Sequence, residues 1–219
     1  MRALTKKVFK DISRRKMRTI ATILGIAIGI IGLTGINIAS SQFKSSLEYS
    51  ADITAQPDIQ IYTVPTTPDL ASVLREQPNV KTVEARGSIV TNWAVGEDHI
   101  LIQVFGILDF QHVQINHFAL TEGTLPGPGQ IVLDASDKTL DNVQVGDQIE
   151  VQVGSTYQKV TISGFARTQG LPSASITGRG QGYMSESAFQ TLFQVNGVTN
   201  FAVRLNDYTT RYATAQQLA

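Results

Sequence analysis

The chain has 219 residues, 42% of them hydrophobic, which is enough for one sizeable core and a membrane anchor. It has no cysteine, which excludes disulfides, thiolate nucleophiles and thiolate metal sites. The net charge of zero is unevenly spread: residues 1–18 hold eight basic residues and one acidic, whereas residues 44–219 hold ten basic and seventeen acidic. The basic head suits an anionic membrane surface, and the acidic remainder argues against a nucleic-acid partner.

Residues 1–18 predict a cytoplasmic amphipathic helix lying on the membrane. Leu4, Val8 and Ile12 recur every fourth residue, which places them on one side of a helix. Basic residues cover the other sides, where they face lipid phosphates as a membrane-surface anchor: Lys6, Lys7, Lys10, Arg14, Arg15, Lys16 and Arg18. A merely basic, irregular tail is the alternative.

Residues 19–43 predict a transmembrane helix. The stretch contains no charged residue, and about 20 apolar residues suffice to cross the hydrocarbon core. The positive-inside rule keeps residues 1–18 in the cytoplasm and makes residues 44–219 extracytoplasmic. A cleavable signal peptide is the alternative, although the apolar core exceeds the usual ~7–15 residues.

Small residues follow one side of this helix. Ala21, Gly25 and Gly29 are four apart, and Gly32 continues the same side. Such spacing lets a second helix approach closely, so we expect a packing face there. The alternative is that these are ordinary glycines, which are common in membrane helices.

The exterior part begins with a β-α-β pattern. A strand is expected at 58–64, a helix at 69–77, and strands at 80–85, 88–95 and 99–107, all rich in β-branched residues. Within them Trp93 and Phe105 are expected to be core residues rather than ligand platforms.

The middle of the chain predicts strands and turns. Strands are expected at 130–133, 148–153 and 158–165, the last two joined as a hairpin through residues 154–156. The Gly- and Ser-rich residues 169–182 predict a mobile loop, with Ser173, Ser175 and Arg179 as candidate partner contacts. A helix capped by Ser185 should follow at 185–194, then a strand at 198–205 and a last helix from 207.

Together these elements predict an α+β fold: one N-terminal transmembrane helix, then a mixed α/β lobe with an inserted β-rich lobe. The expected discontinuous α/β lobe comprises residues 44–107 and 183–219. Residues 108–182 form the expected insertion.

Catalytic signals are weak. Residues 178–182 are glycine-rich but lack the lysine and frame of a phosphate-binding loop, and there is no G-x-S-x-G elbow. His112 and His117 have few further ligands nearby, so no metal site is expected. The carboxylates at 134, 137, 141, 147 and 150 read as solvated turn residues. We therefore expect no catalytic residue, cofactor or metal in this chain.

A series of motifs carries a family resemblance. The basic head runs into LGIAIGI at 24–30, followed by VFGILDF at 104–110, LTEGTLP at 120–126, GQIVLD at 129–134, VGDQIEV at 145–151 and VTISGFA at 160–166. In order and spacing this resembles the N-terminal half of ABC-transporter permeases of the MacB/LolC/FtsX type. In that family the first membrane helix is followed by an extracytoplasmic domain of a mixed α/β lobe and an inserted β-rich lobe.

The resemblance implies a non-catalytic permease subunit of an ATP-driven machine in the cell membrane. Its implied partners are a cytoplasmic ABC ATPase, a second permease subunit, membrane lipid and an extracytoplasmic adaptor. The implied work is mechanical coupling of ATP hydrolysis to the exterior domain, for export or lipoprotein release. The family has three further membrane helices, so the chain is expected to be a fragment, a designed piece or a truncated product. The alternatives are a single-pass anchored binding or scaffold protein and, with no supporting cluster, an anchored hydrolase.

Overall fold

The computed structural model describes residues 16–53, 55–95, 97–168 and 173–218, without the side chains of 16, 18, 19, 43–53, 118 and 168. It divides into two units, Met1–Tyr49 and Ser50–Ala219, which are described separately. The predicted surface helix at 1–18 falls largely outside the described residues.

The first unit is built on one long helix, α2 (Lys16–Ile53), of 38 residues. Its apolar stretch Ile20–Gln42 is 23 residues long, and none of its most apolar 18 residues is buried. At 1.5 Å per residue this stretch is about 34 Å long, which is sufficient for a bilayer core of ~30 Å. A helix over residues 19–43 is therefore confirmed and continues as far as Ile53, while its crossing of a membrane stays a prediction.

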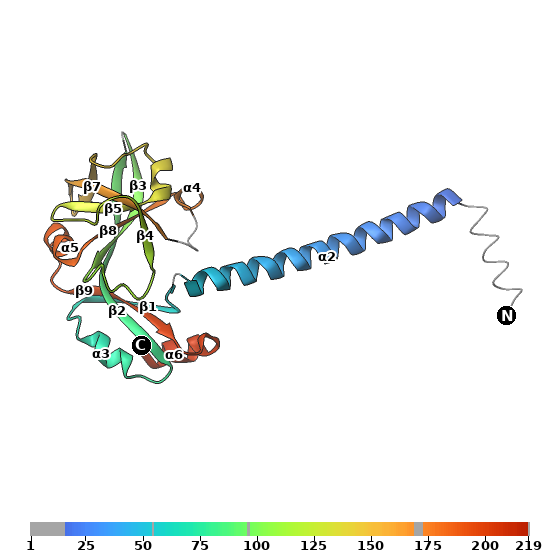
Figure 1. Cartoon of the computed structure of the whole chain (residues 1–219), viewed down its shortest axis with the longest axis horizontal. Helices are drawn as coiled ribbons and strands as arrows, with labels where there is room; N and C mark the ends of the chain where they lie inside the picture. Colours follow the sequence, from blue (N-terminus) through green and yellow to red (C-terminus); the bar gives the residue numbers. More distant parts are fainter. Residues whose placement is uncertain (1–15, 54, 96, 169–172, 219) are drawn as a thin grey trace, which may run out of the picture. The chain divides into compact units, whose positions relative to one another are not determined.

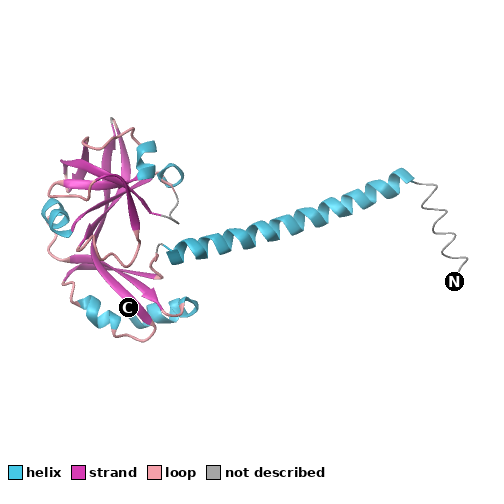
Figure 2. Cartoon of the chain, viewed as in Figure 1, coloured by secondary structure: helices cyan, strands magenta, loops and turns pink. Residues whose placement is uncertain are grey.

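The second unit contains a small α/β lobe (Figures 1 and 2). Its antiparallel strands are β1 (Ile59–Thr66), β9 (Val198–Leu205) and the first half of β2 (Val80–Val95), in the order β1-β9-β2. Helices α3 (Leu70–Arg75) and α6 (Arg211–Leu218) lie on one face, and a short 3-10 turn, η2 (Tyr208–Thr210), precedes α6. Between helices and sheet is an apolar core that includes Leu74, Val83 and Phe201.

The second half of β2 enters a barrel. It pairs with β3 (Asp98–Ile107), then follow β8 (Arg179–Ser185), β5 (Gln130–Asp134), β7 (Thr156–Thr168) and β6 (Gln148–Val153). β6 returns to β2 through Trp93↔Val151 and Ala94↔Glu150, so the six strands form a closed circuit. β4 (Phe118–Gly123) extends the sheet from β7.

The barrel encloses its own core, which includes Trp93, Ile102, Leu133 and Phe165. Short helical turns cover it: η1 (Ala135–Thr139), α4 (Ala174–Thr177) and α5 (Glu186–Phe193). In α5 the Ser185 hydroxyl accepts the Ala188 N–H, which satisfies one of the unpaired donors at a helix start. Phe189, fully buried, anchors α5 to the barrel.

Most predicted elements are confirmed, including the β6–β7 hairpin and the strand at 198–205. Trp93 and Phe105 are buried, as expected. The strands predicted at 80–85 and 88–95 are one continuous strand, because Gly87 stays extended and pairs with Gly106. β4 and η1 were not predicted. The chain is α+β as predicted; the predicted lobe boundaries stay a prediction, since β2 is common to both lobes.

The expected loop at 169–182 is wrong for its second part. Residues 174–177 form α4, and Arg179–Ser185 form β8, parallel to β3. The glycines reflect packing: a Cβ at Gly182 would overlap the side chain of Ile131, and one at Gly180 would lie 3.3 Å from Asp137 Oδ2.

The expectation that all carboxylates at 134–150 are solvated is wrong for Asp137. Its side chain is completely buried in η1, beneath β8.

Candidate functional site

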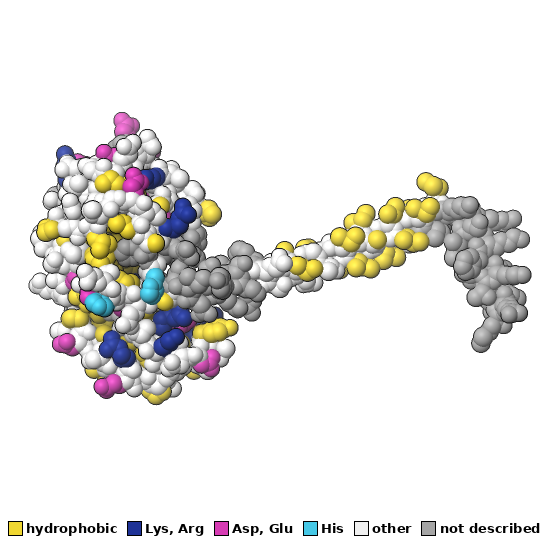
Figure 3. Space-filling view, viewed as in Figure 1, with side chains coloured by type: hydrophobic (Ala, Val, Ile, Leu, Met, Phe, Trp, Pro, Cys, Tyr) yellow, Lys and Arg dark blue, Asp and Glu magenta, His cyan; other side chains and the backbone are white. Residues whose placement is uncertain are grey.

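The apolar face of α2 is the first functional feature. Ile31 and Leu33 are 69% and 68% exposed, and apolar side chains cover the helix along the span (Figure 3). Such a surface is unfavourable in water, at about 25 cal/mol for each Å² of apolar area, and suits lipid or other membrane helices.

The small residues predicted as a packing face lie in this span. A Cβ added at Gly25, Gly29 or Gly32 would meet no other atom within 4 Å. Within the described part of the first unit, nothing covers the side of the helix that carries these glycines and Ala21, so a second helix could approach it there. The packing role itself stays a prediction.

The other predicted site residues are spread over both units. Lys6, Lys7, Lys10, Arg14 and Arg15 lie outside the described residues, as do the side chains of Lys16 and Arg18.

Ser173 caps α4 through the Ser175 N–H, at 3.4 Å, and Arg179 is an exposed residue at the start of β8. The three candidate contacts are thus on ordered elements, and their partner role stays a prediction.

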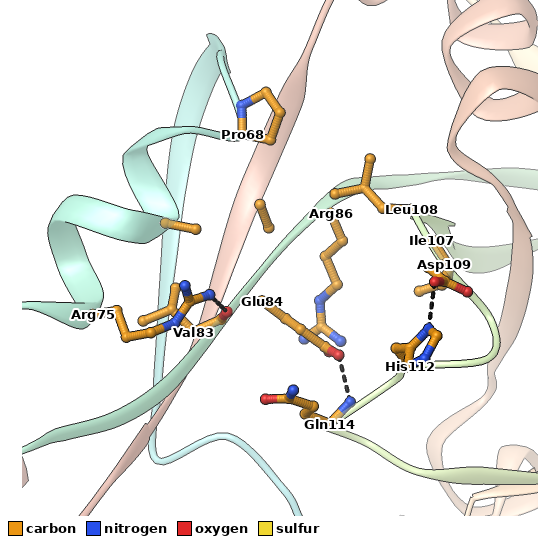
Figure 4. Close-up of a pocket in the computed structure, with 12 residues that line it drawn as sticks. Pro68, Arg75, Val83, Glu84, Arg86, Ile107, Leu108, Asp109, His112 and Gln114 are labelled. Atoms are coloured by element: carbon orange, nitrogen blue, oxygen red, sulfur yellow. Dashed lines mark hydrogen bonds and ion pairs between the residues drawn. The ribbon is translucent and has the colours of Figure 1, made fainter.

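A pocket of about 300 Å³ lies where the α/β lobe meets the barrel (Figure 4). Three segments line it. They are α3 with its preceding turn, residues 83–86 of β2, and residues 107–114 at and after the end of β3.

Arg86 is the buried cation of this pocket. It is only 2% exposed, its Nε donates to Asn200 Oδ1 at 2.8 Å, and its guanidinium lies 4.9 Å from the centre of the Phe105 ring. Burial lowers the pKa of Arg86 from its ordinary value, although an arginine still keeps its charge. Its Nη2 has no hydrogen-bond partner among the described residues, which is costly for a buried charged group.

Glu84 is the acidic neighbour of Arg86. Its Oε1 accepts the Gln114 N–H at 2.5 Å, and so it fastens the segment after β3 to the sheet. Burial raises the pKa of Glu84, and the Gln114 hydrogen bond and the Arg86 charge oppose that rise. Closer to solvent, His112 Nδ1 lies 2.6 Å from Asp109 Oδ2, and this hydrogen bond lowers the pKa of Asp109.

A second buried acid lies in the barrel. Asp137 Oδ2 accepts the Gln181 N–H at 2.9 Å, and burial raises the pKa of Asp137 to about 8. Asp137 is therefore protonated at neutral pH. Within the described residues no group of three histidines and carboxylates is placed to hold a metal ion.

The sequence patterns did not reveal the pocket. Glu84 and Arg86 are two apart in β2, so both face the same side of the sheet. That alternation was a usable signal for a polar strand face. The residues opposite, Asp109 and His112, were not predictable, because their segment has no periodic pattern.

The family model of the MacB-like periplasmic core domain matches residues 19–219. The chain belongs to this MacB-like family. The family is one of ABC transporter permeases, so this MacB-like chain is part of a membrane-anchored permease and carries its extracellular domain.

Two solved structures are similar to this MacB-like chain. The extracellular domain of the noncanonic ABC-type transporter YknZ from Gram-positive bacteria is 16% identical, with 71% of this chain and 86% of that chain covered and a TM-score of 0.45. The periplasmic region of MacB from Actinobacillus actinomycetemcomitans is 15% identical, with 73% and 81% covered and a TM-score of 0.42. No curated protein matches the chain.

Proposed function

We propose that this MacB-like chain passes motion from a cytoplasmic ABC ATPase to its extracytoplasmic domain, for export or lipoprotein release. One observation carries the proposal. α2 runs unbroken from the apolar span to Ile53, while the second unit already begins at Ser50. The helix that contains the apolar span thus continues into the first residues of the second unit, and this continuity along the chain supports transfer of a shift or rotation of the helix to that unit.

Orientation and assembly belong to the same proposal. The basic residues at 1–18 favour a cytoplasmic N-terminus and contact with anionic lipid. The open side of α2 at Gly25 and Gly29 favours packing against another membrane helix, such as one from a second permease subunit. An exterior adaptor is a further proposed partner.

The experiment combines the protein with the ABC ATPase that co-purifies with it from its source cells, in lipid nanodiscs. Dyes on Val64→Cys, an exposed position in β1, report the distance between the exterior units of two copies. Three glycines inserted between Ser46 and Leu47 interrupt α2, and three inserted between Gly154 and Ser155 in the β6–β7 turn are the control.

We expect ATP to change the distance in the parent protein and the control, and the α2 insertion to abolish that change while the ATPase stays bound. A distance change that survives the α2 insertion would contradict mechanical coupling through this helix. An ATPase that never co-purifies with the protein would favour the anchored scaffold instead.

A further inference from the structure

The pocket at the lobe junction continues into a longer groove. A second pocket, of about 670 Å³, adjoins it and shares Arg75 and Gln114 with it. Residues 83–86 of β2 line the first pocket, and Lys81 and Thr82 line the second. Six consecutive residues of β2 therefore form the floor of one groove, about 20 Å long at ~3.3 Å per residue.

This stretch of β2 is a strand edge. Residues 80–86 pair with β9 on one side, and pairing with β3 on the other side begins only at Gly87. Among the described residues no strand pairs with that other side before Gly87. An open edge is a template for a further strand.

The hydrogen bonds show which backbone groups face the groove. The Asp58 N–H donates to Val203 O at 2.8 Å, so the Val203 backbone faces β1 and away from β2. Its register partner Val83 therefore faces away from β9, and Ala85, two residues on, faces the same way. Arg75 Nη2 donates to Val83 O at 3.1 Å, which confirms that this carbonyl points into the groove (Figure 4).

The groove is basic in an otherwise acidic unit. Among the residues that the structure describes, Arg75, Lys81, Arg86 and Arg204 line it, together with two acids, Glu84 and Asp109.

Asp58 lies 3.8 Å from Arg204 and offsets its charge, and Glu84 and Asp109 offset two of the other three basic charges, which leaves a net charge of about +1 among these residues. Within the described part of the chain, the buried Nη2 of Arg86 has no hydrogen-bond partner. The remaining field favours a negative partner.

We propose that this edge of β2 binds an extended peptide segment with acidic side chains, supplied by another protein. The segment adds a strand beside residues 81–86, and its carboxylates lie against the basic side chains of the groove. Arg75 releases Val83 O and binds a carboxylate of the peptide instead. A peptide N–H then donates to Val83 O. A second copy of the same edge is disfavoured as the occupant, because Lys81 and Arg75 would face like charges.

The test uses the full chain in detergent and fluorescent eight-residue peptides. In one peptide valine alternates with glutamate, in the second valine alternates with lysine, and the third is the glutamate peptide with methyl groups on alternate backbone nitrogens. We expect the glutamate peptide to bind at least about tenfold tighter than the lysine peptide, equivalent to ~1.4 kcal/mol. The methylated peptide should not bind, because it cannot pair with the edge.

Variants of the chain separate charge from backbone pairing. Lys81→Glu should lower the affinity for the glutamate peptide about tenfold. Lys159 is exposed on β7, so Lys159→Glu should leave that affinity unchanged. Ala85→Pro removes a groove-facing N–H and should abolish binding, with thermal melting as the check on folding.

The proposal would be overturned if no peptide bound, if the lysine peptide bound equally, or if the methylated peptide bound as well as its parent. None of these outcomes depends on an ATPase, so the proposed coupling is tested separately.

Discussion

Asp137 shows how burial makes one residue sensitive to pH. Its pKa is raised from 3.8 to about 8, chiefly by burial, and the nearby charge of Asp134 adds to the effect. The folded protein therefore keeps a proton that the unfolded chain releases above pH ~4. The stability that this proton provides is complete below the unfolded pKa and is lost as the pH rises towards 8, at up to about 1.4 kcal/mol per pH unit.

Asp137→Asn should remove this dependence, because an uncharged amide replaces the protonated acid. Between pH 5 and pH 8 the melting temperature of the parent should fall relative to the variant, and the variant should be the more stable at pH 8. Thermal melts across this range measure the difference. Parallel pH curves for the two proteins would show that Asp137 is not the group responsible.

Gly123 lies where β4 and β7 approach each other closely. It has φ +78°, and a Cβ there would overlap the carbonyl oxygen of Ser163 on β7. Gly129 has φ +67° but open space around it, so it is a matched control. We expect Gly123→Ala to cost about 2–4 kcal/mol of unfolding free energy and Gly129→Ala about 1 kcal/mol. Urea unfolding measures both; equal costs would mean that backbone conformation alone matters.

Single residues were predictable where local chemistry decides their place. Trp93 and Phe105 lie in strands rich in β-branched residues and are buried, as the pattern indicates. Asp137 follows a turn-rich pattern in which carboxylates are normally solvated. It is buried because Gln181, distant in the sequence, lies over it. No local signal reports such a contact.

At the scale of elements, the predicted segments with strong local signals match the structure. α5 begins after its Ser185 cap, and β6 alternates apolar and polar residues, so both follow from their own sequence. β8 did not, because its glycines resemble a loop. Its extended form comes from seven register pairs with β3 and from the Ile131 side chain that fills the space over Gly182.

Gly29→Leu should disrupt the proposed packing face of α2. The added side chain prevents the close helix approach that small residues allow. Ala27→Leu is the control, since at about 100° per residue it lies roughly 200° around the helix from Gly29. We expect energy transfer between labelled copies in lipid to fall for Gly29→Leu only. An equal fall for both variants would contradict a specific face.

At the scale of the whole molecule, the groove depends on β2 belonging to both lobes. From Gly87 onward β2 pairs with β3, whereas before Gly87 no strand in the described part of the chain pairs with the same side. The walls come from α3 and from residues 107–114, which are adjacent only in the folded protein. The sequence predicted the long apolar helix, the α+β class and most strands, because these follow from local hydropathy and periodicity. It did not predict the groove, which exists only through tertiary pairing.

The central claim is that α2 crosses the membrane and carries the second unit on the far side from the cytoplasm. The chain has no cysteine, so single cysteines can be introduced without background. Ser155→Cys lies in an exposed turn of the second unit, and Ser13→Cys lies in the basic head. With a membrane-impermeant maleimide on intact cells, we predict labelling at position 155 and labelling at position 13 only after lysis. Labelling at position 13 with protection at 155 in intact cells would contradict the account.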